Sequence, residues 1–154
     1  MNTGRLFVLG IVSAMIVLLL VLAPDNKNQI DDIKPYVQSV AIKDEMELCT
    51  DAELKRDFGI SASQTDGFLL FETADRSDTR LILVLKVKEQ NEADRFRRDI
   101  QKKIRADIKD LPESRSKSRE LLKNAKIITK GKFLFVIISE DSREIIRILR
   151  SAVR

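Results

Sequence analysis

The sequence predicts an α+β fold, in which an N-terminal transmembrane helix precedes a small domain with a four-stranded antiparallel sheet packed against helices. Residues 6–23 contain no charged side chain, which is typical of a membrane span. Four later segments are rich in Leu, Ile, Val and Phe, and amphipathic helices lie around them. Helices that cover one face of an antiparallel sheet form an α+β layer, and we expect a ββα-ββα order.

The apolar segment at the N-terminus would be about 27 Å long as a helix, which is close to the hydrocarbon thickness of a bilayer. A cleaved signal peptide has a shorter apolar stretch of about 7–15 residues, and Pro24 would follow the cut directly. A helix that is apolar all round is also unusual in a soluble domain of this size. We therefore favour an uncleaved signal anchor over residues 1–23. The apolar side chains of this predicted anchor are Leu6, Phe7, Val8, Leu9, Ile11, Val12, Met15, Ile16, Val17, Leu18, Leu19, Leu20, Val21 and Leu22.

A polar linker at residues 24–29 separates the predicted anchor from a domain at residues 30–154. The tail before the anchor is very short and carries Arg5, which favours a cytoplasmic N-terminus. Lys27 and Lys34 follow the anchor, but acidic neighbours dilute them, so the positive-inside rule decides little. We expect a single-pass protein of the cell membrane whose C-terminal domain is extracytoplasmic.

The first part of the domain is predicted to be helical. Apolar residues recur at helical spacing over residues 30–41, which indicates an amphipathic helix. A short extended segment follows at residues 46–48. Thr50 and Glu53 then form a capping box, so we expect a second helix, and Gly59 is placed to end it.

Four apolar segments predict two antiparallel hairpins. Residues 67–73 and 80–88 flank a polar loop, while residues 125–129 and 132–139 flank a Lys-Gly turn. The last segment is the most apolar of the four. We therefore expect it to lie inside the sheet with both faces buried.

Three further helices complete the prediction. Asn91 is expected to cap a long helix that Pro112 ends, and a weaker Ser- and Arg-rich helix runs from there to about Asn124. The final helix follows Asp141. One side of the long helix carries an apolar stripe that would face the core. The stripe consists of Ala93, Phe96, Ile100, Ile104, Ile108 and Leu111.

The composition excludes several classes of function. The chain has no histidine and one cysteine, which removes Ser-His and Cys-His nucleophile pairs and the usual zinc, copper and iron sites. It also has no Gly-rich phosphate loop and no calcium-loop spacing. We therefore predict no catalytic residue, no metal ligand and no cofactor. Cys49 is either a buried small hydrophobe or free to pair with another chain.

Charge is distributed unevenly along the domain. Residues 25–94 carry 9 basic and 16 acidic side chains, whereas residues 95–132 carry 14 basic and 5 acidic ones. Many of these cations lie opposite the apolar stripe of the long helix. They form either an ordinary solvated surface or a face for an anionic partner, such as phospholipid headgroups, a wall polyanion or an acidic protein. Nucleic acid is not expected, because the segment offers no aromatic platform for base stacking. The candidate residues are Arg95, Arg97, Arg98, Lys102, Lys103, Arg105 and Lys109.

Several motifs resemble those of a bacterial family called domain of unknown function 4358. They are an acid-rich helix that ends at Phe58-Gly59, an L-x-N-A step at residues 122–125, and Gly131 before an aliphatic strand. The resemblance covers about residues 46–150 and implies an exported or lipid-anchored protein, mostly of Gram-positive bacteria. It brings no known activity. This chain departs from the lipid-anchored pattern, because no cysteine follows the apolar segment directly.

Together these observations predict a membrane-anchored cell-envelope protein that acts as a non-enzymatic interaction or accessory module. The lipid bilayer is its expected partner, with another envelope protein or an anionic wall or lipid surface as a second one. Two alternatives are a cell-wall hydrolase of the Ser-Lys or carboxylate type and a structural tether. The Ser-Lys alternative has poor spacing in this chain, because Ser116 and Lys117 are adjacent and would point apart on a helix.

Overall fold

The computed structural model describes residues 29–153. The predicted anchor at residues 1–23 therefore lies outside the described residues, as does the linker up to residue 28. Among residues 29–153, no helix combines the length and apolar character that a membrane crossing requires.

The described domain contains one antiparallel sheet of five strands in the order β1-β2-β3-β5-β4. The two predicted hairpins are present, and β5 lies inside the sheet with every residue buried, as expected. The predicted count of four strands is wrong, because the extended segment after the first helix adds β1 at one edge. Its three residues pair with β2, so that Met46 lies opposite Thr73. The strands are β1 (Met46–Leu48), β2 (Gly67–Thr73), β3 (Leu81–Lys86), β4 (Lys126–Lys130) and β5 (Phe133–Ile138).

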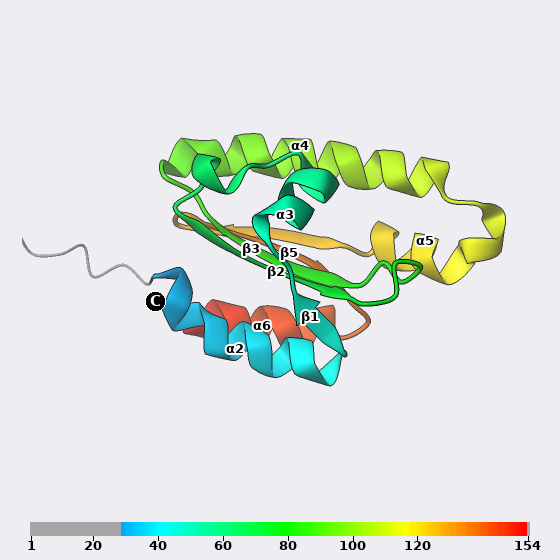
Figure 1. Ribbon diagram of the computed structural model, residues 1–154, viewed down its shortest axis with the longest axis horizontal. Helices are drawn as coiled ribbons and strands as arrows, with labels where there is room; N and C mark the ends of the chain where they lie inside the picture. Colours follow the sequence, from blue (N-terminus) through cyan, green and yellow to red (C-terminus); the bar gives the residue numbers. More distant parts are fainter. Residues whose placement is uncertain (1–28, 154) are drawn as a thin grey trace, which may run out of the picture.

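Helices cover both faces of the sheet, so the domain has three layers (Figure 1). Helices α2 (Ile30–Lys43) and α6 (Ser142–Ala152) pack on one face. The other face carries α3 (Asp51–Phe58), α4 (Gln90–Asp110) and α5 (Ser116–Lys123). Two short 3₁₀ helices, η1 (Ala62–Gln64) and η2 (Glu113–Arg115), precede β2 and α5.

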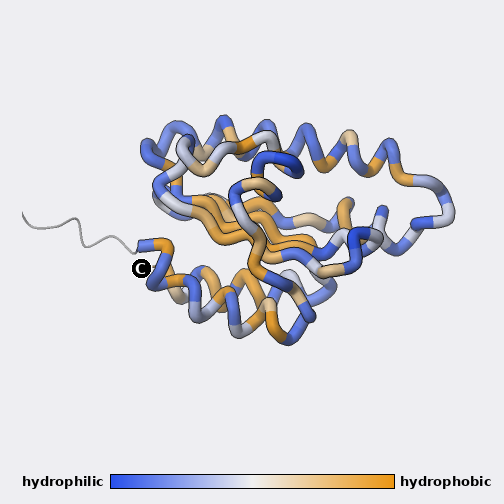
Figure 2. The backbone as a smooth tube through the Cα atoms, in the orientation of Figure 1, coloured by the Kyte–Doolittle hydropathy of each residue, from blue (hydrophilic) through white to orange (hydrophobic). Residues whose placement is uncertain are grey.

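The expectation that helices cover a single face is wrong, and the central strands give the reason. Ile82 and Val84 of β3 enter the core beneath α2 and α6, while Leu83 and Leu85 enter the core beneath α4. Because successive side chains of a strand point to opposite faces, an uninterrupted apolar strand needs cover on both sides. Figure 2 shows the resulting hydrophobic sheet between helices whose outer turns are hydrophilic.

Local signals fix most helix ends. The Thr50 amide donates to the Glu53 carboxylate at 2.8 Å, and Gly59 ends α3 in the left-handed conformation at φ 66°, as predicted. Helix α4 begins one residue before the predicted cap. The Glu89 amide donates to the Glu92 carboxylate at 3.2 Å, so Asn91 lies inside the helix.

Candidate functional site

The outer side of α4 carries a row of five exposed cations, which we call the α4 ridge. Steps of three and four residues keep these side chains in one line, opposite the buried Ala93, Phe96, Ile100 and Ile104. The row is about 21 Å long at 1.5 Å per residue. The acidic residues of α4 lie on its flanks, so positive charge is continuous along the outer line. The α4 ridge consists of Arg95, Arg98, Lys102, Arg105 and Lys109.

Two of the seven predicted cations lie away from the α4 ridge. Arg97 is half-buried on one flank of the helix. Lys103 is on the other flank, where its ammonium group lies 2.6 Å from the Asp107 carboxylate and 6.0 Å from the centre of the Phe58 ring. Lys103 therefore belongs to the wall of a neighbouring cleft.

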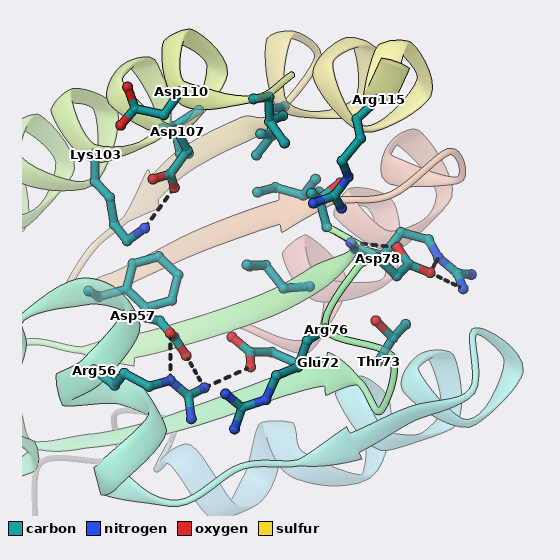
Figure 3. Close-up of a pocket in the computed structure, with 18 of the residues that line it drawn as sticks. Arg56, Asp57, Glu72, Thr73, Arg76, Asp78, Lys103, Asp107, Asp110 and Arg115 are labelled. Carbon is teal, nitrogen blue, oxygen red and sulfur yellow. Dashed lines mark hydrogen bonds and ion pairs between the residues drawn. The ribbon is translucent and has the colours of Figure 1, made fainter. Parts of the chain in front are cut away.

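This cleft has a volume of about 510 Å³ and lies between α3, the loop from β2 to β3, the C-terminal half of α4, and η2. Apolar side chains from the core under α4 form its floor, among them Leu81, Leu111 and Leu122. Charged side chains stand around it, and Figure 3 shows that they come from all four segments. Its volume lies in the range of roughly 300–1,000 Å³ that is typical of small-ligand sites, but ten of its 19 lining residues are charged, which is more than such sites usually have.

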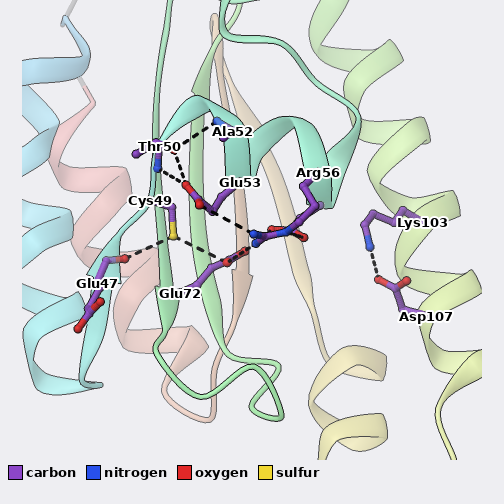
Figure 4. A network of polar contacts seen from close by, with 10 residues as sticks. Glu47, Cys49, Thr50, Ala52, Glu53, Arg56, Glu72, Lys103 and Asp107 are labelled. Atoms are coloured by element: carbon purple, nitrogen blue, oxygen red, sulfur yellow. Dashed lines mark hydrogen bonds and ion pairs between the residues drawn. The ribbon is translucent and has the colours of Figure 1, made fainter.

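One wall of the cleft is a polar network centred on Arg56 (Figure 4). Two guanidinium nitrogens bind the Asp57 carboxylate at 2.8 and 2.5 Å. The Arg56 guanidinium also lies 3.8 Å from a Glu53 carboxylate oxygen and 3.8 Å from a Glu72 carboxylate oxygen. The Cys49 thiol donates to the same Glu72 carboxylate at 3.7 Å. Three carboxylates thus surround one arginine at the junction of α3 and β2.

Burial and charge shift the pKa values of this network in different directions. Partial burial raises the pKa of Glu72, and the nearby Asp57 carboxylate adds to the effect. Partial burial also raises the pKa of the Cys49 thiol to about 11, with the negative charge of Glu72 as the next cause. The Thr50 hydroxyl and amide instead lower the pKa of Glu53. The Cys49 side chain is half-buried beside the Glu72 carboxylate, so it is neither fully buried nor fully exposed.

The lysine of the Ser-Lys pair considered from the sequence, Lys117, forms an ion pair with an acidic residue. The Lys117 ammonium lies 2.8 Å from the Glu140 carboxylate, and this hydrogen bond raises the pKa of Lys117. A lysine serves as a general base only when its pKa is depressed. The neighbouring Ser118 hydroxyl accepts a hydrogen bond from Arg115 at 3.4 Å. Within residues 29–153, no group of acidic or thiol side chains is arranged to hold a metal ion.

The polypeptide that forms this cleft and the α4 ridge matches a known family. The model of the family described as Domain of unknown function (DUF4358) matches residues 38–139. The chain belongs to the DUF4358 family. This membership confirms the resemblance that the motifs of α3 and of the second hairpin predict. The DUF4358 region begins within α2 and extends past β5, so it includes every strand, the α4 ridge and the cleft. No curated protein and no solved structure matches the chain.

Sequence reasoning missed the cleft as a site. Its lining comes from segments that are distant along the chain, and most of these segments have ordinary surface composition. One signal was available in the loop from β2 to β3, where residues 75–80 contain four charged side chains in six positions. Such a loop is more charged than a simple hairpin connection requires.

Proposed function

We propose that this DUF4358 domain is a non-enzymatic interaction module, held at the bacterial cell membrane by the predicted N-terminal anchor. The α4 ridge is the observation that carries the proposal. Five exposed cations in one line, with no acidic residue among them, attract a partner of opposite charge over about a Debye length of 8–10 Å. An ordinary solvated helix surface more often mixes both signs, as the flanks of α4 do.

The position of the α4 ridge favours a partner other than the anchoring bilayer. Ile30, the first residue of α2, packs on the face of the sheet opposite α4. The predicted linker of six residues spans at most roughly 20 Å when fully extended. With its tether on one face, the domain presents the α4 ridge on the other. This arrangement supports an anionic wall polymer or an acidic protein face as the partner.

Binding between the α4 ridge and an anionic partner is tested with the full-length chain in nanodiscs of zwitterionic lipid. Poly(glycerol phosphate) is the anionic probe. The triple variant R98E/K102E/R105E reverses the centre of the α4 ridge. The matched control R143E/R147E/R150E makes the same charge change on exposed residues of α6, on the opposite layer. Binding is measured by interferometry over a series of salt concentrations.

We expect the ridge variant to lose probe binding while the α6 variant keeps most of it. The wild-type affinity should fall with rising salt, because the contact is electrostatic. Equal losses in both triple variants would mean that net charge alone attracts the probe, and the ridge proposal would be abandoned. Unchanged binding in the ridge variant would leave the structural tether as the better interpretation.

A carboxylate hydrolase is the alternative from a different class, and Glu72 is the observation that favours it. A carboxyl group with a raised pKa in a cleft has the property that a general acid needs. The test is release of soluble fragments from purified cell wall by the wild-type chain and by E72Q. Turnover by the wild type that E72Q lacks would replace the interaction proposal with a hydrolase.

A further inference from the structure

One edge of the sheet ends in β4, and the outer side of this strand has no backbone partner among residues 29–153. Lys130 and Phe133 of the neighbouring β5 face each other across a two-residue turn, and such a closing pair is hydrogen-bonded. Because hydrogen-bonded pairs alternate along an antiparallel ladder, Ile127 and Thr129 direct their N–H and C=O groups away from β5. An unpaired strand edge of this kind is a template for a further extended segment.

A groove lies beside this edge, and we call it the β4 groove. It has a volume of about 560 Å³ and is bounded by the C-terminal half of α4, the segment from α5 to β4, and β4 itself. Six of its ten lining residues are apolar, so the side chains of an added strand would find apolar surface on which to pack. These six residues are Ile104, Ile108, Leu122, Ala125, Ile127 and Ile128.

The charged residues that line the β4 groove are all cationic. They are Arg105, Lys123 and Lys126, and each of them is exposed. None of the three forms an ion pair with another residue of the described part of the chain. Arg105 donates one hydrogen bond, to the backbone oxygen of Gln101 at 3.2 Å. The lining therefore has an excess of positive charge.

Two glutamates lie near Lys126, but neither lines the β4 groove. Glu120 and Glu140 line a neighbouring hollow to which Lys126 also contributes. The Glu140 carboxylate already lies 2.8 Å from the ammonium group of Lys117. Glu120 is exposed and forms no ion pair within residues 29–153. The cations of the β4 groove thus keep their charge available for a partner.

We propose that the β4 groove binds an extended acidic peptide segment of another protein, which adds to the five-stranded sheet as a further strand beside β4. Successive side chains of such a segment point to opposite faces of the sheet. One set would pack beside Ile108 and Ile127 on the α4 side, and the other set would lie beside Lys126 on the other face. A segment that alternates apolar and acidic residues suits both faces, and its backbone completes the ladder. The proposal does not rest on the α4 ridge, with which the groove shares Arg105 alone.

A second copy of the chain fits this edge less well. Two β4 strands that pair antiparallel about Ile128 would place Lys126 of one copy opposite Lys130 of the other. Like charges directly opposite each other destabilise a strand pair. An acidic segment replaces this repulsion with attraction, so charge complementarity favours it as the occupant.

The test titrates the full-length chain in zwitterionic nanodiscs with synthetic peptides, and backbone amide and methyl NMR report binding. The probe is the heptapeptide EVEVEVE, blocked at both ends. KVKVKVK reverses its charge, and EEEEVVV keeps its composition but removes the alternation. Two further versions of the probe are N-methylated on alternate residues, so that each lacks the N–H groups of one peptide edge.

We expect EVEVEVE to shift the amide signals of Ile127 and Thr129 and the methyl signals of Ile108, and to slow solvent exchange of the two amides. KVKVKVK and EEEEVVV should bind about tenfold more weakly or not at all. One N-methylated probe should lose binding while the other keeps it, because only one edge of the peptide pairs with β4.

The double variant K123Q/K126Q should weaken binding of EVEVEVE about threefold to tenfold. The matched control K43Q/K55Q removes two exposed lysines on α2 and α3, outside the groove, and should leave binding unchanged. T129P removes an outward N–H group, at a kind of edge position that tolerates proline, and should abolish binding. If T129P fails to fold, the two N-methylated probes test the same backbone pairing on the wild-type chain.

Several outcomes would overturn the proposal. They are no shift with EVEVEVE, equal binding of KVKVKVK or EEEEVVV, equal binding of both N-methylated probes, and equal losses in K123Q/K126Q and K43Q/K55Q. Slow exchange of the Ile127 and Thr129 amides before any peptide is added would also overturn it, because a second copy or another segment of the chain would then already cover the edge. None of these outcomes decides whether the α4 ridge binds a polyanion, because Lys123 and Lys126 are not part of the ridge.

Discussion

The ammonium group of Lys86 lies 3.1 Å from the carboxylate of Asp66, although the Lys86 side chain is only 7% exposed. The same ammonium group donates to the Gln29 side-chain oxygen at 3.0 Å. Gln29 is the N-cap of α2, and Lys86 is the last residue of β3. This contact therefore fastens the start of α2, where the predicted linker enters the domain, to the centre of the sheet.

The first prediction is that K86M destabilises the domain by about 1.5–3 kcal/mol, the usual range for a hydrogen bond to a charged group. Methionine keeps the nonpolar volume but removes both donated hydrogen bonds, and the Gln29 oxygen then lacks its partner. Asp66 is 53% exposed and regains water, which limits the loss. Urea denaturation followed by circular dichroism measures the change. The exposed K55M is the control and should change stability by under about 0.5 kcal/mol.

The second prediction concerns Gly67, which packs against the same helix start. Its φ of +140° is open to glycine but strained for other residues, and an added Cβ would lie 3.0 Å from the Cγ2 atom of Ile30. We expect G67A to cost about 1–3 kcal/mol in unfolding free energy. G59A has a strained φ of +66° but no atom within 4 Å of the new Cβ, so it should cost less.

A double-mutant cycle separates the two causes at Gly67. Because I30A removes the Ile30 Cγ2 atom, which lies nearest to the new Cβ, and keeps only the Ile30 Cβ at 3.2 Å, I30A/G67A should lose less stability than the sum of the single variants. Strictly additive losses would show that contact with the Ile30 Cγ atoms does not contribute to the cost of G67A. Thermal unfolding of the four proteins at one pH supplies the comparison.

The α4 ridge was predictable from the sequence because helical periodicity maps positions onto faces. The spacing of Phe96, Ile100 and Ile104 fixes the buried side of α4 and thereby fixes which cations lie outward. Lys103 shows the limit of this reasoning. Helical periodicity places Lys103 on a flank of α4. Only the packing of α3 against the sheet brings Phe58 and the cleft next to Lys103.

Lys86 and β1 were harder to predict for a related reason. Alternation along β3 correctly places Leu83 and Leu85 on one face, yet it assigns Lys86 to a polar surface. Its burial depends on Asp66 and Gln29, which approach from other segments. The three residues of β1 carry too little pattern to mark a strand, and only the neighbouring β2 makes them one.

The third prediction concerns the pH dependence of stability at Glu72. A carboxyl group whose pKa is raised on folding keeps its proton in the folded state at a pH where the unfolded chain has lost it. Glu72 therefore contributes stability below its unfolded pKa of about 4.5, and this contribution is lost as pH rises through the higher folded pKa. Compared with E72Q, the wild type should become relatively less stable between pH 4 and pH 7.

E53Q provides a control of opposite sign when the titration is extended below pH 4. The pKa of Glu53 is lowered on folding, so its contribution is present above 4.5 and is lost as pH falls through the folded pKa. Glutamine keeps the capping box but removes the charge. As pH rises, the stability of the wild type should therefore increase relative to that of E53Q and decrease relative to that of E72Q. Parallel pH profiles for the two variants would contradict the assigned shifts.

The last prediction is that Cys49 reacts slowly with thiol reagents. A pKa of about 11, raised from 9.0, leaves about a hundredfold less thiolate at neutral pH, and the thiolate is the reactive form. Iodoacetamide should therefore label the folded chain far more slowly than the urea-unfolded chain. E72Q removes the second cause of the shift and should speed labelling, whereas E47Q should not, because Cys49 contacts only the backbone oxygen of Glu47. Labelling that is equally slow in E72Q would show that burial and the Glu53 charge, and not Glu72, raise the pKa of Cys49. Labelling of the folded wild type as fast as that of the unfolded chain would contradict the raised pKa.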